Sequence, residues 1–216
     1  MSTSSKRDSE KQIKWYKGKK PPGDNDRDVF MFLSGSADKP PGKGVGEVLH
    51  DGHNVMYKAL HGMKNWRKVL SNFWVCPFEY DGKTYNSAEH AYHAEKFRMV
   101  AEMREEETAS KYAEKFQVPD EDLSASEVNF SDLKGSDVKK KGGSRSFAMY
   151  PDEIELWGKI SEFVLQSILE QKFSQCPLAK DVLLATGDSV LVHSMGRCGV
   201  RHHWDFLEDI RQKLRQ

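Results

Sequence analysis

Cysteine is scarce in this 216-residue chain, and its scarcity argues against two classes of protein. The three cysteines, Cys76, Cys176 and Cys198, are odd in number, far apart in the sequence and in no Cys-x-x-Cys pair. This spacing argues against a disulfide-stabilised scaffold and against a cysteine-ligated zinc site. We therefore expect a protein of a reducing compartment, which is intracellular and either cytoplasmic or nuclear.

The sequence also lacks a net charge and any long apolar run. Its 33 lysines and arginines balance 33 aspartates and glutamates, so no global field favours nucleic acid or a membrane surface. No apolar run approaches the roughly 20 residues that span a bilayer. The first residues, MSTSSKRDSEKQ, have no apolar core of the kind that a secretory signal needs. We expect a monomer that binds no membrane.

What the chain does contain divides into an arm and a domain. Residues 1–27 are rich in Ser, Lys and Asp and are locally basic, which predicts a disordered arm. A solubilising tail is the simpler interpretation of this arm, and contact with nucleic acid or a nuclear address is the alternative. Residues 28–216 have the length and the apolar content of one domain.

The most informative stretch of that domain runs from Leu70 to Phe97 and reads LSNFWVCPFEYDGKTYNSAEHAYHAEKF. Its first half alternates like a hairpin, and Asp81-Gly82 suits a tight two-residue turn because Gly accepts a positive φ at no steric cost. Asn86 and Ser87 are good helix N-caps, so a helix is expected to begin there and to run to about Val100.

One face of this helix carries four chemically active side chains. Glu89, Tyr92, His93 and Lys96 stand at i, i+3, i+4 and i+7. Spacing alone is equally compatible with a solvated face that holds a Glu–Lys pair. The preceding segment favours a site, because it sets hydrogen-bonding groups beside flat apolar surfaces, as recognition of a base or sugar requires. That segment is Ser71, Asn72, Phe73 and Trp74.

The same stretch resembles the signature of the NADAR superfamily, whose members include N-glycosidases acting on ADP-ribose-type and riboflavin-precursor compounds. The family pattern has Ser-Asn-Phe near the hairpin, then Ser-x-Glu-His, then a Lys-Phe/Ala pair. This chain carries the three elements at residues 71–73, 87–90 and 96–97. The resemblance covers roughly residues 28–215, and it is dense over 42–97 and 183–197 and thin between 100 and 150.

A glycine-rich loop precedes the central stretch. Glycines at 42, 44 and 46 let the backbone approach a ligand closely and present amides to an anion, and Lys43 adds positive charge. The spacing excludes a Walker loop. The run PGKGVGE resembles an element of the larger NADAR proteins, of viral and eukaryotic-microbe type. The resemblance implies that the segment from Lys43 to Glu47 contacts the pyrophosphate or the distal ribose.

A second, C-terminal element carries the resemblance further. Leu183-Leu184-Ala185-Thr186, followed by Leu191-Val192-His193, is similar to the C-terminal motif of the family. The bacterial riboflavin-precursor members usually have Glu where this chain has His193. Met195-Gly196-Arg197 follows, as in the larger ADP-ribose-type forms. Arg197 is suited to bind a phosphate or a carboxylate.

The remaining segments set the expected fold class. Apolar periodicity predicts a core helix over 151–173 and further helices over 177–185 and 204–214, and apolar runs predict buried strands at 29–33 and 190–192. Residues 48–69 are expected to form a loop, residues 118–132 a mobile acidic loop, and Lys139–Lys141 the basic end of a short helix. The whole predicts an α+β fold, a compact and mainly helical single domain with a few short strands.

The sequence offers little support for a metal. His50, Asp51, His53 and His61 gather in one segment, but their spacing fits no regular site. Arg67 is expected at the surface, with contact to a phosphate as the alternative. We therefore expect metal-independent chemistry without a cofactor.

The resemblance and the residues together favour an N-glycosidase that removes ADP-ribose from a modified base, guanine in DNA or RNA above all. Lys96 is the candidate nucleophile, Glu89 the proton shuttle and Glu47 a second acid or base. The expected ligand-binding residues are Lys43, Gly44, Gly46, Ser71, Asn72, Phe73, Trp74, Ser87, Tyr92, His93, His193 and Arg197. The alternatives are a module that binds ADP-ribose or NAD without turnover, and a hydrolase of a riboflavin-pathway N-glycoside.

Overall fold

The computed structural model describes residues 27–32, 39–119, 129–195 and 200–216, and within them helices dominate. The helices are α1 Lys58–Gly62, α2 Trp66–Val69, α3 Ala88–Arg104, α4 Glu107–Glu114, α5 Ser136–Lys141, α6 Pro151–Gln175, α7 Pro177–Ala185 and α8 Asp205–Lys213, with a short 3-10 turn, η2, at His53–Val55. The strands are β1 Val29–Phe32, β2 Phe78–Tyr80, β3 Lys83–Tyr85, β4 Val190–Met195 and β5 Val200–His203. The predicted α+β class is confirmed.

The larger sheet joins the two ends of the described chain. Its order is β1-β4-β5, with β1 parallel to β4 and β5 antiparallel to β4. The register pairs Phe30 with Leu191 and Phe32 with His193. Phe30 and Phe32 are fully buried, as the apolar run predicted. Because β4 continues past Val192, it carries His193 to the end of the parallel pair.

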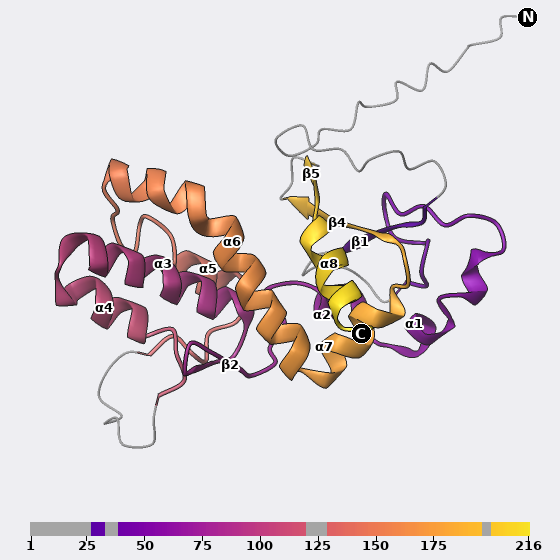
Figure 1. The fold of residues 1–216 in the computed structure, drawn as a ribbon, viewed down its shortest axis with the longest axis horizontal. Coiled ribbons are helices and arrows are strands. Elements are labelled where there is room, and N and C mark those ends of the chain that lie inside the picture. Colours follow the sequence, from indigo (N-terminus) through magenta and orange to yellow (C-terminus); the bar gives the residue numbers. More distant parts are fainter. Residues whose placement is uncertain (1–26, 33–38, 120–128, 196–199) are drawn as a thin grey trace, which may run out of the picture.

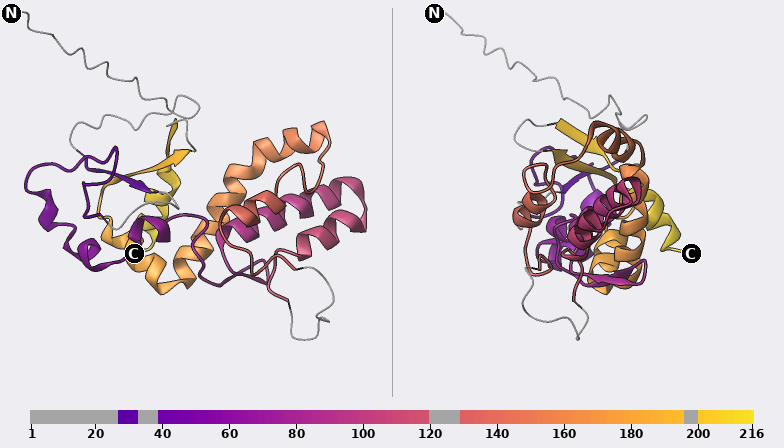
Figure 2. Two further views of the ribbon diagram at one scale, coloured as in Figure 1. Left: turned by 180° about the vertical axis from the view of Figure 1, so that it is seen from behind. Right: turned by 90° about the vertical axis from the view of Figure 1, so that its left-hand side faces the viewer.

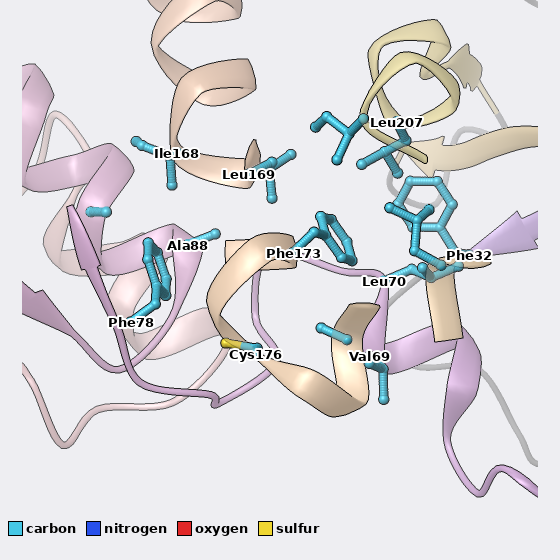
Figure 3. Packing of buried hydrophobic residues seen from close by; sticks show 14 of the residues in the cluster. Phe32, Val69, Leu70, Phe78, Ala88, Ile168, Leu169, Phe173, Cys176 and Leu207 are labelled. Atoms are coloured by element: carbon cyan, nitrogen blue, oxygen red, sulfur yellow. The ribbon is translucent and has the colours of Figure 1, made fainter. Parts of the chain in front are cut away.

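Helix α6 links the sheet to the helices α3, α4 and α5, which lie at the opposite end of the molecule in both the front and the back view (Figures 1 and 2). Close by, Ile168 and Leu169 project from α6 between Phe78 and Ala88 on one side and Leu207 on the other (Figure 3). Side chains from all these elements form one continuous buried cluster. One large core cluster therefore spans the described residues, with two smaller clusters around Met31 and Met99.

The N-terminal half of α6 departs from the predicted core helix. Ile154 is 57% exposed, and Trp157 and Ile160 are partly buried against Met99 and Val100 of α3, whereas Ile168 and Phe173 are fully buried. The apolar period is regular along the helix, but periodicity reports which residues share a face and not whether another element covers it. Only the C-terminal half of α6 lies between α3 and the sheet.

The hairpin and its turn are confirmed. β2 pairs antiparallel with β3 around Asp81 and Gly82, whose φ angles are 49° and 65°. Two successive positive φ angles match the twist of the flanking strands. Helix α3 begins after Ser87, as predicted, and runs on to Arg104, beyond the expected end at Val100. Glu105, with φ 51°, closes it in the left-handed conformation.

The prediction of a loop over residues 48–69 is wrong. That segment contains η2, α1 and α2, and it buries Leu60, Trp66 and Val69. Helices of three to five residues complete little more than one turn, so no apolar period develops in the sequence.

Other expectations have mixed outcomes. Helix α7 spans Pro177–Ala185 as predicted, and α5 ends on Lys139–Lys141. Within the described residues no helix has the length and apolar character to cross a bilayer. Residues 1–26, which include nearly all of the expected basic arm, and residues 120–128 of the expected acidic loop lie outside the described residues.

Candidate active site

The Ser-Asn-Phe segment supports the start of α3. The carbonyl of Asn72 accepts a hydrogen bond from the amide of Glu89 at 3.1 Å, which satisfies one of the first amides of the helix. The buried ammonium of Lys172 donates to the carbonyls of Val69 and Ser71, both at 2.8 Å. Burial lowers the pKa of Lys172 to about 8. The backbone of the motif is thus fixed from two sides.

Ser87 occupies the N-cap position, but its hydroxyl makes no capping bond. It lies 2.8 Å from Nδ1 of His90, whose Nε2 lies 3.1 Å from the carbonyl of Phe130. A carbonyl only accepts, so Nε2 carries the proton and Nδ1 accepts from Ser87. Burial lowers the pKa of His90, which keeps the ring neutral. Ser87 therefore supports the helix start through His90, and its role as a ligand contact stays a prediction.

The face of Glu89, Tyr92, His93 and Lys96 is not solvated, and that interpretation is wrong. The side chains of Glu89 and His93 are 9% and 7% exposed, and Lys96 is 8% exposed. Oε1 of Glu89 lies 3.1 Å from Nε2 of His93. The amine of Lys96 donates to the carbonyl of Gly142. A carboxylate, an imidazole and an amine are therefore enclosed together.

Burial changes the acid–base properties of these groups. It lowers the pKa of Lys96 to about 8, against an opposing effect of the Glu89 carboxylate. Burial also lowers the pKa of His93, again opposed by Glu89. His93 is therefore neutral at pH 7, with Nε2–H donating to Glu89 and Nδ1 left as an acceptor.

Gly142, at the end of α5, closes the site over His93. A Cβ at this position would lie 2.1 Å from Nδ1 of His93, a distance that no real contact has. Among the described residues, this Nδ1 and Oδ1 of Asn72 are buried without a hydrogen-bond partner. Buried acceptors without donors are rare in native proteins.

His193 approaches the site from the sheet. Its ring packs between Phe32 and Trp204, with centroids 5.2 and 5.1 Å away. Burial lowers the pKa of His193 to about 4, helped by the charges of His202 and Lys139 and opposed by Glu89. The ring is therefore a neutral group at pH 7. Arg197, predicted to bind a phosphate, lies outside the described residues.

The two aromatic residues after Asn72 line a hollow. Phe73 and Trp74, with Ser71, Lys68 and Lys134, surround a cavity of about 420 Å³. This volume falls in the range of small-molecule pockets. The ring of Tyr92 packs against Trp157 at 4.9 Å, and its contact with a ligand stays a prediction.

The glycine-rich loop folds around Glu47. The guanidinium of Arg67 forms two bonds with this carboxylate, at 2.6 and 2.7 Å, and the amides of Gly42 and Gly44 donate to it at 3.0 and 2.9 Å. Two of the amides expected to cradle an anion are thus taken by a carboxylate of the loop itself. Surface placement of Arg67 is wrong, since its side chain is 3% exposed.

The same contacts concern the prediction that Glu47 acts as a second acid or base. Its side chain is fully buried, and the amide of Met31 adds a fifth donor at 3.3 Å. Five hydrogen bonds, two of them from the guanidinium of Arg67, therefore occupy this carboxylate, and its role as an acid or base stays a prediction. Lys43 is exposed in this loop, and its contact with a ligand stays a prediction. Gly46 has φ 84° and packs against Arg201.

Several supporting residues carry little or no signal in the sequence. Gly142 follows a lysine run and reads as an ordinary helix end, and Lys172 lies on a helix whose neighbours look like core. Only contacts from distant segments give them their roles. A lysine at an otherwise apolar helix position was the one available sign for Lys172.

Comparison with known proteins places this arrangement in a family. The NADAR domain model matches residues 60–197, more than half of the chain. Comparison with curated proteins gives no significant match. Among solved structures, the NMR structure of the Escherichia coli protein YbiA aligns at 22% identity and a TM-score of 0.46, over 69% of this chain and 79% of that chain. The family match contains α3 and His193 and begins after the glycine-rich loop. The chain belongs to the NADAR family, which includes N-glycosidase-like members.

Proposed function

We propose that the chain is an N-glycosidase that cleaves the bond between ADP-ribose and a modified base, with ADP-ribosylated guanine in DNA or RNA as the favoured substrate. One observation carries the proposal. The amine of Lys96 is enclosed beside the carboxylate of Glu89, and burial brings its pKa to about 8. At pH 7 about a tenth of such an amine is neutral and nucleophilic.

The reaction needs a nucleophile at the anomeric carbon and a proton for the departing base. The neutral amine of Lys96 attacks the anomeric carbon, and the bond to the base breaks with its electron pair leaving on the base. The carboxylate of Glu89 takes the proton that the attacking nitrogen releases and passes it to the departing base. Opening of the ribose ring leaves an imine between Lys96 and the sugar. Water then adds to the imine carbon, which releases ADP-ribose and regenerates the amine.

Residues of the α3 face and of the Ser-Asn-Phe segment suit this chemistry. Glu89 lies on the same face of α3 as Lys96, and its hydrogen bond to His93 fixes the position of its carboxylate. His93 is neutral and adds no charge that would oppose an oxocarbenium-like centre. Phe73 and Trp74 offer aromatic surfaces to the base, and Oδ1 of Asn72 offers an unfilled acceptor.

Product analysis tests the proposal. The protein is incubated separately with an oligonucleotide carrying ADP-ribosylated guanine, with NAD and with ADP-ribosylated protein, and the products are identified by mass spectrometry. We expect free ADP-ribose and unmodified guanine from the oligonucleotide. Release of nicotinamide from NAD alone would assign a different substrate. Binding of ADP-ribose without any product would support a non-catalytic module, and turnover of a riboflavin-pathway N-glycoside instead would assign the smaller substrate.

A further inference from the structure

Asp28, His50 and His53 gather three metal-binding side chains far from Lys96. Nδ1 of His50 lies 2.9 Å from Oδ1 of Asp28, and Nδ1 of His53 lies 3.0 Å from Oδ2. The two imidazole centroids are 5.6 Å apart. In the described part of the chain this is the one group of three such residues whose donor atoms all lie within 4.8 Å of one another.

The Asp28 carboxylate of this cluster accepts two further hydrogen bonds. The hydroxyl of Tyr57 donates to Oδ2 of Asp28 at 2.6 Å, and the amide of His50 donates to Oδ1 at 2.8 Å. Such outer bonds fix the orientation of ligating carboxylates in metal sites. The carboxylate is 2% exposed, whereas the rings of His50 and His53 are 32% and 40% exposed. The arrangement is therefore rigid at its base and open to an ion from solvent.

The donor set and its spacing fit a divalent transition metal. Ligand atoms bound at about 2.0–2.2 Å to a tetrahedral Zn²⁺ stand roughly 3.3–3.5 Å apart. The two nitrogen–oxygen distances here are shorter than that by only a few tenths of an ångström. We propose that Asp28, His50 and His53 form a binding site for a Zn²⁺-like divalent cation, with water completing the coordination.

Such an ion would link the end of the glycine-rich loop to the start of strand β1. Asp28 immediately precedes β1, and Val29 pairs through its backbone with Val48, at 2.8 and 3.0 Å. His50 lies two residues after Val48, so the ion would bridge Asp28 and the residues that follow the glycine-rich loop. The region around α1 lies at the opposite end of the molecule from α3 (Figure 1). The site is structural and separate from the chemistry of Lys96.

Cobalt and zinc titrations of the untagged full chain test this proposal. After dialysis against a chelator and then against metal-free buffer at pH 7.5, Co²⁺ is added and the visible absorption is recorded. Zn²⁺ binding is measured by calorimetry. We expect one ion per chain, d–d bands of a low-coordinate Co²⁺ complex, and a Tm that rises with Zn²⁺, because an ion bound only to the folded state stabilises it.

Two variants make the test specific. His53→Gln removes one half-exposed ligand and is expected to weaken Zn²⁺ binding at least tenfold, with an unchanged circular dichroism spectrum. His61→Gln alters an exposed histidine of α1 outside the cluster and is expected to bind like the wild type. Equal affinity in wild type and His53→Gln, or no ion bound by the wild type, would overturn the proposal and leave the cluster as a set of hydrogen bonds.

Discussion

At the scale of one residue, burial changes the acid–base behaviour of the Lys96 amine. An exposed lysine is almost fully charged at neutral pH, whereas burial between α3 and α5 brings the pKa of this one to about 8. Its carbonyl partner, Gly142, accepts a hydrogen bond without supplying a countercharge. Glu89 is the group that limits the shift.

This pKa predicts the pH dependence of turnover. The lowered pKa means that the neutral, nucleophilic form gains population as pH rises and saturates above about 8. We therefore expect kcat/KM for the ADP-ribosylated oligonucleotide to rise about tenfold per pH unit between pH 6 and 7.5 and then to level off. A profile that is flat over this range would contradict a reaction limited by deprotonation of Lys96.

Gly142 gives a second prediction at this scale. Its φ of −76° is accessible to alanine, so Gly142→Ala tests the contact with His93 and not the backbone. We expect the added methyl group to displace the imidazole, to lower the free energy of unfolding by about 1–3 kcal/mol and to reduce turnover at least tenfold.

Gly158→Ala is the matched control, because a Cβ at this position of α6 meets no atom within 4 Å. It is expected to keep full turnover and to stabilise the helix slightly. Equal turnover in the two variants would show that Gly142 does not position His93.

At the scale of an element, the glycine-rich loop is held by hydrogen bonds to one of its own residues, Glu47. Glu47 and Arg67 form a buried ion pair with bidentate geometry, and loop amides complete it. Removing one partner of a buried pair leaves an uncompensated charge. We expect Arg67→Ala to lower the free energy of unfolding by about 3–5 kcal/mol, measured by urea denaturation.

Lys111→Ala provides the comparison for that measurement. Lys111 pairs with Glu107 on the solvent face of α4, with side chains 69% and 83% exposed. Exposed pairs contribute about 0–1 kcal/mol. Similar losses in both variants would contradict the structural role of the Glu47–Arg67 pair.

The elements also show what the sequence could predict and why. The hairpin and the whole of α7 follow from local turn chemistry and proline, which need no distant partner. The start of α3 was predicted from Ser87, although its hydroxyl makes no capping bond and the carbonyl of Asn72 accepts from the amide of Glu89 instead. The site face on α3 was identified by spacing, but its burial was not, because α5 and α6 cover it from residues far along the chain. The bonds from the amides of Gly42 and Gly44 to Glu47 were not predicted for the same reason, since only the folded loop brings Glu47 onto them.

At the scale of the whole molecule, the two functional regions are built on different elements. Lys96 and Glu89 belong to α3, which lies at the opposite end of the molecule from α1 (Figure 1), whereas Asp28, His50 and His53 belong to the segments that precede β1 and α1. The sequence did not indicate that Asp28 lies beside the two histidines, because the backbone pairing of Val29 with Val48 that brings them together leaves no pattern in the sequence.

This separation predicts the effect of chelation. A divalent ion held by Asp28, His50 and His53 contributes no group to the chemistry at Lys96. We expect turnover at 25 °C to survive dialysis against EDTA, while the Tm falls. Complete loss of turnover that one divalent ion restores would contradict metal-independent chemistry, and circular dichroism after dialysis controls for unfolding.

The central claim is that Lys96 forms a covalent bond with the sugar, and trapping with borohydride tests it most directly. Borohydride added during turnover reduces the imine to a stable amine, and peptide mass spectrometry locates the adduct. We expect one ADP-ribose adduct on Lys96 in the wild type. Lys96→Arg, which keeps the charge but stays protonated, is expected to bind ADP-ribose, to give no adduct and to lose turnover by several orders of magnitude. Lys159→Arg, on the exposed face of α6, is expected to match the wild type. Near-normal turnover of Lys96→Arg, or turnover without an adduct in the wild type, would contradict the covalent mechanism.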